Sequence, residues 1–171
     1  GYVESTSSPA GLTKPSKAPA EDIAVAYAKS AGSDFGLGSG SGKTLVVTKA
    51  QRLTAGATAV HVGQRVEGLR VTDAVLTVVV SPDGRVMSAS GRLAKGTTAR
   101  GPSAGLTARQ ALDASAAKQG AKADRPLREA EVRSTGKKTF PNVYGQGSAS
   151  QRPVTAELAW YPSADGQSLR L

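Results

Sequence analysis

The feature that most restricts the fold is a run of β-branched residues interrupted by a turn signal. Residues 69–80 end in three consecutive valines, the turn Ser81-Pro82-Asp83-Gly84 follows, and a second alternating segment occupies residues 85–91. Pro and Asp favour the early positions of a tight turn, and Gly accepts the positive φ that such a turn requires. The sequence therefore predicts a β-hairpin in which Asp83 and Gly84 have a structural role.

Two earlier segments extend this hairpin into a meander. Residues 44–48 and 58–66 are rich in valine and threonine, which favour the extended conformation. A glycine- and serine-rich loop over residues 36–42 leads into the first of them. We therefore expect an antiparallel sheet of about four consecutive strands.

A helix is predicted before the meander, over about residues 20–31. Glu21 lies in its first turn and Gly32 follows its last turn, as the helix dipole and helix termination favour. Residues 1–19 contain almost nothing to bury, which predicts a flexible arm. The first subdomain is therefore expected over residues 20–95.

The second half is predicted to repeat this order after a polar linker over residues 96–105. Thr107 and Gln110 have the spacing of a capping box, so a helix is expected over about residues 107–119. Three further strands are predicted over residues 127–134, 154–161 and 167–171. The expected fold class is α+β, with the second subdomain over residues 106–171 and each subdomain formed by a helix packed on a curved antiparallel sheet.

Composition excludes several classes of function. The 171 residues contain no cysteine, so disulfide frameworks, thiol catalysis and cysteine-ligated zinc are excluded. The net charge is +9, divided almost evenly between the two halves of the chain. We therefore expect a general preference for acidic partners and not one nucleic-acid footprint. No apolar run approaches the ~18 residues of a membrane helix, so no membrane insertion is expected.

Gly36 to Thr44 contains Gly-Lys-Thr and superficially suggests a phosphate-binding loop. The spacing requires Gly where Leu37 stands, and a strand is predicted where such a loop needs a helix. His61 is the only histidine, so the chain lacks the histidines for a zinc site with paired His, for an H-E-x-x-H peptidase motif and for a Ser-His-Asp triad with a second, orienting His. We expect it to face away from Val60 and Val62, toward solvent or an interface.

Acidic side chains are scattered singly or beside bases, which favours solvated faces over a glycosidase pair. The most basic stretch is interrupted by acids and has no aromatic stacking residue before Phe140. The sequence therefore predicts no catalytic residue, no cofactor-binding residue, no metal ligand and no nucleic-acid partner.

One stretch of the chain nevertheless resembles a known family. Gln64, the segment Gly68-Leu69-Arg70-Val71, an apolar strand, Asp83-Gly84 and a strand that ends at Gly91 resemble the fungalysin/thermolysin propeptide domain. Arg70 stands where the family often has proline. Gly105 to Leu112, together with Ala159-Trp160-Tyr161-Pro162 and Leu169-Arg170-Leu171, is similar to the PepSY-type half that follows it in fungalysin-type precursors.

The resemblance implies a pair of cystatin-like subdomains that is not an enzyme. It implies a secreted, extracellular propeptide that inhibits a zinc metallopeptidase and assists its folding, with zinc only in the partner catalytic domain. A freestanding secreted inhibitor or regulatory module, or a cell-surface module that binds anionic polymers, are the alternatives.

The residues of the resemblance are assigned two roles. We expect Gln64, Gly68, Val71, Asp83, Gly84 and Gly91 to maintain the fold, with a buried hydrogen bond at Gln64 and a turn or bulge at Gly68. Ser168, Leu169, Arg170 and Leu171 alternate polar and apolar side chains and are the expected partner-binding segment.

Overall fold

The computed structural model describes residues 4–96, 99–100, 106–118, 130–132, 137–140, 154–163 and 168–170. They form two compact units. The first unit contains the described residues of 1–100 and 159–170, and the second unit those of 101–158. Each unit is described separately.

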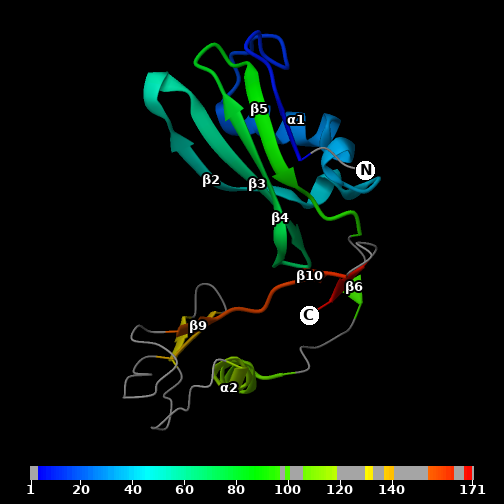
Figure 1. Cartoon of the computed structure of the whole chain (residues 1–171), viewed down its shortest axis with the longest axis vertical. Coiled ribbons are helices and arrows are strands. Elements are labelled where there is room, and N and C mark those ends of the chain that lie inside the picture. Colours follow the sequence, from blue (N-terminus) through cyan, green and yellow to red (C-terminus); the bar gives the residue numbers. More distant parts are fainter. Residues whose placement is uncertain are drawn as a thin grey trace. The chain divides into compact units, whose positions relative to one another are not determined.

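The first unit is built on a five-stranded antiparallel sheet with the order β1-β5-β4-β3-β2 (Figure 1). The strands are β1 (Ser5–Ser7), β2 (Leu45–Arg52), β3 (Thr58–Val66), β4 (Leu69–Val80) and β5 (Val86–Arg92). The predicted four-stranded meander is confirmed as β2 to β5.

The segment that was expected to be a flexible arm contributes the fifth strand, which corrects that prediction. β1 pairs with β5, and Ser5 lies opposite Ser90. Beyond the strand, the amide of Leu12 donates to the carbonyl of Val86 over 2.6 Å, and the amide of Ser16 donates to the carbonyl of Asp83. The composition of this segment indicates only that it has few side chains to bury. Main-chain hydrogen bonds to an edge strand form without any buried side chain.

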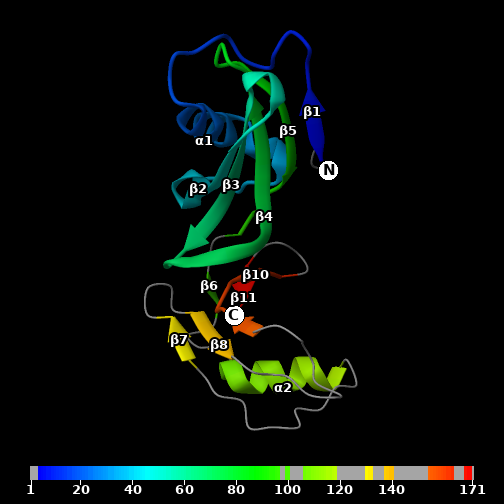
Figure 2. The ribbon, with the colours of Figure 1, turned by 90° about the vertical axis from the view of Figure 1, so that its left-hand side faces the viewer.

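Helix α1 (Ala20–Ser30) covers one face of this sheet, as Figure 2 shows edge-on. Its buried face consists of Ala24 and Ala28, whose short side chains let the helix approach the strands closely. The core between them is mainly aliphatic, with one aromatic side chain: Phe35, Leu45, Val60, Val62, Leu76, Val78, Val80, Val86, Ala89 and Leu93. The predicted helix is confirmed within one residue at its end.

The glycine-rich segment between α1 and β2 forms two short 3-10 turns, η1 (Gly32–Phe35) and η2 (Ser41–Thr44). Gly38 lies so close to the carbonyl oxygen of Lys95 that a Cβ has no room there. The buried Thr44 hydroxyl donates to the Ser41 carbonyl over 2.7 Å, and β2 follows directly. The segment therefore joins a helix to a strand, which is the reverse of a phosphate-binding loop.

Residues 159–163 and 168–170 belong to the first unit and not to the second subdomain in which they were predicted. Strands β10 (Tyr161–Pro162), β11 (Leu169–Arg170) and β6 (Ala99–Arg100) form a three-stranded sheet with β11 in the middle. β11 runs antiparallel to β10 and parallel to β6. The chain passes from the first unit to the second within the predicted boundary at residues 96–105, and it returns to the first unit at Ala159. The predicted boundary is therefore only one of two crossings between the units.

The second unit contains helix α2 (Ala108–Lys118) and the antiparallel strands β7 (Ala130–Val132), β8 (Lys137–Phe140) and β9 (Val154–Ala156). The predicted capping box is confirmed. The Thr107 amide donates to Oε1 of Gln110 over 2.8 Å, and the Gln110 amide donates to the Thr107 hydroxyl over 3.2 Å.

Other predictions for this half are only partly covered by the structure. β8 (Lys137–Phe140) lies outside the three strands that were predicted for this half. Asp165 and Gly166, between the last two predicted strands, lie outside the described residues. The repetition of a cystatin-like subdomain stays a prediction.

Candidate partner interface

Two residues of the predicted partner-binding segment, Ser168 and Leu169, are buried. Leu169 is fully buried, and the buried Ser168 donates its hydroxyl hydrogen to the Ser163 hydroxyl over 3.1 Å. Leu169 pairs with Pro162 on one side and with Ala99 on the other. This corrects the prediction for Ser168 and Leu169, because a central strand offers a partner neither a free edge nor these side chains. Arg170 pairs in β11, and Leu171 lies outside the described residues.

Gln64 holds the end of β3 to the segment that follows β5. Its side chain is 2% exposed, and its Oε1 accepts a hydrogen bond of 2.6 Å from the Ala94 amide. Its Nε2 donates to the Ala94 carbonyl and to the Thr44 hydroxyl, each over 3.2 Å. The side-chain carboxamide of Gln64 thus forms the two hydrogen bonds with the Ala94 backbone that a neighbouring strand would form. Because this side chain is buried, it does not form part of a partner surface.

Gly68 and Val71 lie at the hairpin between β3 and β4. Glu67 and Gly68 both have positive φ between the paired residues Val66 and Leu69, the conformation of a two-residue turn that suits the twist of a hairpin. The Arg65 guanidinium donates to the Gly68 carbonyl over 2.8 Å. Val71 is buried and forms a parallel bridge with Trp160.

Trp160 is the structural residue whose role the sequence reasoning missed. Its indole Nε1 donates to the Val66 carbonyl over 3.0 Å, its amide donates to the Arg70 carbonyl, and its carbonyl accepts from the Thr72 amide. β4 bends away from β3 next to this contact, at Asp73, whose φ is +53°. A lone tryptophan in an aromatic-poor chain was the available signal, but nothing local to it identified its partners.

The turn between β4 and β5 orders Asp83 by hydrogen bonds. The Ser81 hydroxyl and the Arg85 guanidinium both donate to this carboxylate, the latter over 2.9 Å. The hydrogen bond from Ser81 is the main reason that the pKa of Asp83 lies below its ordinary value, and the positive charge of Arg85 adds to it. The turn therefore stabilises the ionised form of the Asp83 carboxyl group. A catalytic proton donor would instead need its protonated form to be stabilised.

The two glycines of this hairpin are needed for space as well as for conformation. Gly84 has φ +78°, and a Cβ on it would collide with the backbone of Ser16. Gly91 has φ +123°, and a Cβ there would collide with the carbonyl oxygen of Val75. Both positions therefore serve packing of the first unit and not contact with a partner.

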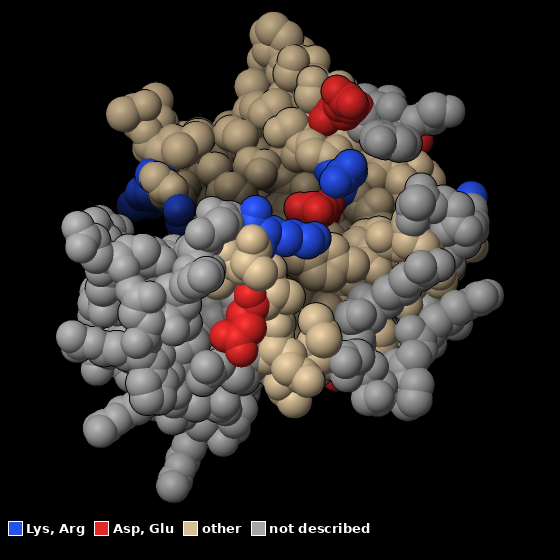
Figure 3. All heavy atoms as spheres, turned by 60° about the horizontal axis from the view of Figure 1, so that its bottom comes forward, with Lys and Arg blue, Asp and Glu red and all other residues tan. Residues whose placement is uncertain are grey.

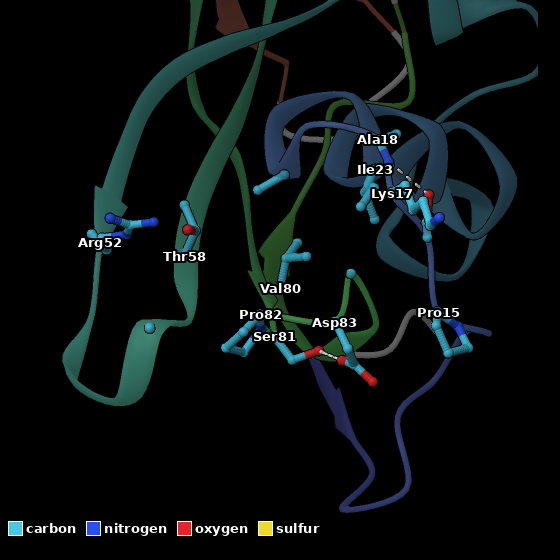
Figure 4. A pocket seen from close by; sticks show the side chains of 14 residues that line it. Pro15, Lys17, Ala18, Ile23, Arg52, Thr58, Val80, Ser81, Pro82 and Asp83 are labelled. Atoms are coloured by element: carbon cyan, nitrogen blue, oxygen red, sulfur yellow. Dashed lines mark hydrogen bonds between the residues drawn. The ribbon is translucent and has the colours of Figure 1, made fainter.

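A cleft of about 690 Å³ opens between three segments of the first unit. Figure 4 shows Arg52 and Thr58 on one side, Ile23 and Lys17 on the other, and Pro82 between them. Its only described titratable side chains are Lys17, Arg52 and Asp83, and Asp83 already accepts from its own turn. The cleft can receive an apolar side chain, but its lining offers no acid-base pair.

His61 lies on β3, half-buried, with Nδ1 3.1 Å from the Thr77 hydroxyl on the neighbouring strand. Within the residues that the structure describes, no three His, Cys, Asp or Glu side chains gather where they could hold a metal ion. None of the described helices is long and apolar enough to cross a membrane. The described contacts of His61 are thus those of a cross-strand pair.

Charged side chains do not gather into one patch on the face in Figure 3, where Lys and Arg atoms of the described residues alternate with Asp and Glu atoms. Strand β2 is one of the two outer strands of the five-stranded sheet. β2 is paired on one side only, and its residues from Val47 to Arg52 are exposed. This edge is the described feature most suited to contact another polypeptide.

Comparison with known proteins identifies the same region. Among curated proteins, none matches the chain. Residues 43–93, which run from the end of η2 through β2, β3, β4 and β5, match the Fungalysin/Thermolysin Propeptide Motif.

Proposed function

We propose that the chain is the propeptide of a secreted fungalysin-like zinc metallopeptidase and that it acts as a non-covalent inhibitor and folding chaperone of the catalytic domain. The observation that supports this most strongly is the propeptide motif over residues 43–93. The motif coincides with the meander that forms most of the sheet in the first unit. The zinc ion of the reaction belongs to the catalytic domain, and the chain itself performs no chemical step.

Inhibition in this proposal needs only tight binding across the substrate cleft. An extended segment that pairs with an edge strand of the enzyme occupies the cleft without donating a catalytic group. Chaperoning needs binding to catalytic-domain structure that is already present in the folding transition state, because only such contacts accelerate folding. Both roles follow from one interface, which also stabilises the folded partner by mass action.

The experiment is a titration of the full chain into the catalytic domain of a fungalysin-type peptidase, with peptide hydrolysis as the readout. A thermolysin-type enzyme serves as the control for selectivity. Stoichiometric loss of activity confined to the fungalysin-type enzyme is the expected result. Full activity at micromolar concentrations of folded chain would contradict the inhibitory role.

Chaperoning is measured separately. The denatured catalytic domain is diluted into buffer with or without the chain, and the recovered peptidase activity is followed after the chain has been removed by proteolysis. A higher yield and a faster rate are expected with the chain. An equal yield would contradict the chaperone role even if inhibition is observed.

The alternatives are separated by two observations. A coding frame that continues into an H-E-x-x-H motif favours the propeptide over a freestanding inhibitor or regulatory module. The segment between Asp34 and Glu67 has no acidic residue, which is the feature that favours an anionic-polymer-binding module. That function predicts binding whose affinity falls steeply with salt concentration, whereas occupation of an enzyme cleft does not require it.

A further inference from the structure

The exposure of β2 is unusual for a strand of a two-layer fold. Where a helix covers one face of a sheet, alternate residues of each strand should be buried, and they are in most of β4. In β2 only Leu45 is buried, while every residue from Val47 to Arg52 is exposed. Both faces and the outer edge of this half of the strand are therefore accessible at once.

The charge of this edge has one sign. The chain contains no Asp or Glu between Asp34 and Glu67, so every ionised residue of β2 and of the hairpin it forms with β3 is cationic. Lys49 and Arg52 are exposed and make no ion pair with any residue that the structure describes. An acidic partner would therefore meet two uncommitted cations on one strand.

Apolar side chains flank these cations. Val47 and Leu53 are each 38% exposed and are among the few large apolar side chains that the described part of the chain leaves accessible. A strand laid along β2 would cover both of them and would pair the outward N–H and C=O groups of β2. The edge thus offers main-chain hydrogen bonds, apolar contact and charge selection together.

We propose that β2 binds an extended, acidic segment of the peptidase catalytic domain, which adds to the sheet as a sixth strand. The identity of this partner rests on the proposed function. A second copy of the chain is the disfavoured occupant, because antiparallel pairing of two β2 strands would bring cationic side chains of the two copies together. Main-chain pairing supplies the affinity, and Lys49 and Arg52 select a segment that carries Asp or Glu.

The first test uses short peptides and the full chain, independently of any peptidase. The probes are a fluorescent octapeptide of repeated Glu-Glu-Val-Val, which carries Glu on both faces of an extended strand because Lys49 and Arg52 lie on opposite faces of β2, the same peptide with Lys in place of Glu, the Glu peptide with alternate backbone nitrogens methylated, and poly-glutamate. The unmodified Glu peptide is expected to bind more tightly than each of the other three. Equal binding of the methylated peptide or of poly-glutamate would overturn the proposal, since charge alone would then suffice, and so would no binding of any probe.

Charge reversal tests the selecting residues. Lys49→Glu/Arg52→Glu is expected to weaken binding of the Glu peptide by roughly tenfold and to improve binding of the Lys peptide. The matched control is Lys14→Glu/Lys95→Glu, which changes the net charge equally at two exposed lysines outside β2. Equal weakening by both double variants would overturn the assignment to this edge.

A pair of proline variants tests the backbone. Ala50 and Gln51 pair with Val60 and Ala59, and neighbouring residues of an antiparallel strand point their N–H groups to opposite sides. One of Ala50→Pro and Gln51→Pro should therefore break the pairing with β3 and lower the melting temperature, while the other removes an outward N–H and leaves the fold intact. The stable variant is expected to lose binding of the Glu peptide, and unchanged binding by that variant would contradict the proposal.

The same variants separate this inference from the proposed function. If the wild-type chain inhibits the catalytic domain and the charge-reversed variant inhibits it equally well, the propeptide function stands and the role of β2 is wrong. If the Glu peptide binds at β2 but the chain inhibits no fungalysin-type enzyme, the edge stands and the proposed function is wrong. Sedimentation adds a third criterion, because a dimer that the proline variant dissociates would assign the edge to a second copy.

Discussion

The indole Nε1 of Trp160 donates to the backbone carbonyl of Val66 over 3.0 Å, across 94 residues of sequence. Trp160 is 2% exposed, and its own backbone pairs with the segment from Arg70 to Thr72. The chain leaves the first unit after Arg100 and returns to it at Ala159. This contact therefore holds the returning chain to the hairpin between β3 and β4.

Replacement of Trp160 should show how much of this attachment is hydrogen bonding and how much is packing. Trp160→Phe leaves the Val66 carbonyl without its donor and should lower the free energy of unfolding by about 1–3 kcal/mol. Trp160→Ala also removes the buried ring and should cost about 3–5 kcal/mol. Denaturant unfolding followed by circular dichroism measures both values.

The local consequence is tested by protection of backbone amides against hydrogen exchange. In Trp160→Ala the amides of Thr72 and Ser163 should lose protection, while the amide of Val78 in the centre of the sheet keeps more of it. Uniform loss throughout the first unit would instead show that the docked segment and the sheet unfold as one.

Gln64 should be intolerant of replacement even by residues of similar size. Gln64→Leu removes the hydrogen bonds of the Gln64 side chain to the Ala94 amide and carbonyl and leaves the Thr44 hydroxyl only its bond to the Ser41 carbonyl, so a loss of about 2–4 kcal/mol in unfolding free energy is expected. Gln64→Glu keeps the shape but cannot donate when ionised. Its destabilisation should therefore be larger at pH 7 than at pH 4.5, and an equal effect at both values would contradict the donor role.

Gly84 and Gly68 form a matched pair of substitutions. Both have φ near +80°, but a Cβ on Gly84 meets the backbone of Ser16, whereas a Cβ on Gly68 meets nothing within 4 Å. Gly68→Ala should cost only the conformational strain, about 1 kcal/mol. Gly84→Ala should cost about 2–4 kcal/mol, since the segment before α1 must also move.

Trypsin provides the second readout for this pair. Cleavage after Lys17 should be faster in Gly84→Ala than in Gly68→Ala, because only the former displaces the segment that contains this lysine, whereas the bond after Lys14 precedes Pro15 and resists trypsin. Similar melting temperatures and similar cleavage rates for the two variants would contradict the close approach of Ser16 to the turn.

Ionisation of Asp83 should stabilise the hairpin in a pH-dependent manner. Its pKa is lowered in the folded protein, so the stabilisation is present above the ordinary aspartate pKa and is lost as the pH falls through the folded value. Because the side chain is exposed, the effect should be small. Wild type should melt at a slightly higher temperature than Asp83→Asn at pH 7, and the difference should shrink as the pH falls below the ordinary aspartate pKa; a difference that grows on acidification would reverse the assigned sign.

The sequence by itself determined the local elements of the first unit. Alternating valines and the Pro-Asp-Gly signal specified β3, β4 and β5, because the conformation of a tight hairpin depends on residues that are adjacent in the chain. The capping box at Thr107 and the end of α1 near Gly32 were predictable for the same reason. The motif match over residues 43–93 covers these three strands but neither helix.

Only the tertiary structure decided what pairs across long separations. Residues 4–16 have no apolar pattern, yet they extend the sheet, since hydrogen bonds of the backbone carry no signature in side-chain composition. Leu169 belongs to a segment that alternates polar and apolar residues and was expected at an exposed edge. It lies instead in the middle strand of a sheet, because its neighbour β6 comes from residues some seventy positions earlier. The exposure of β2 from Val47 to Arg52 is decided in the same way by tertiary packing, because which elements cover a strand is not encoded in a short stretch of sequence.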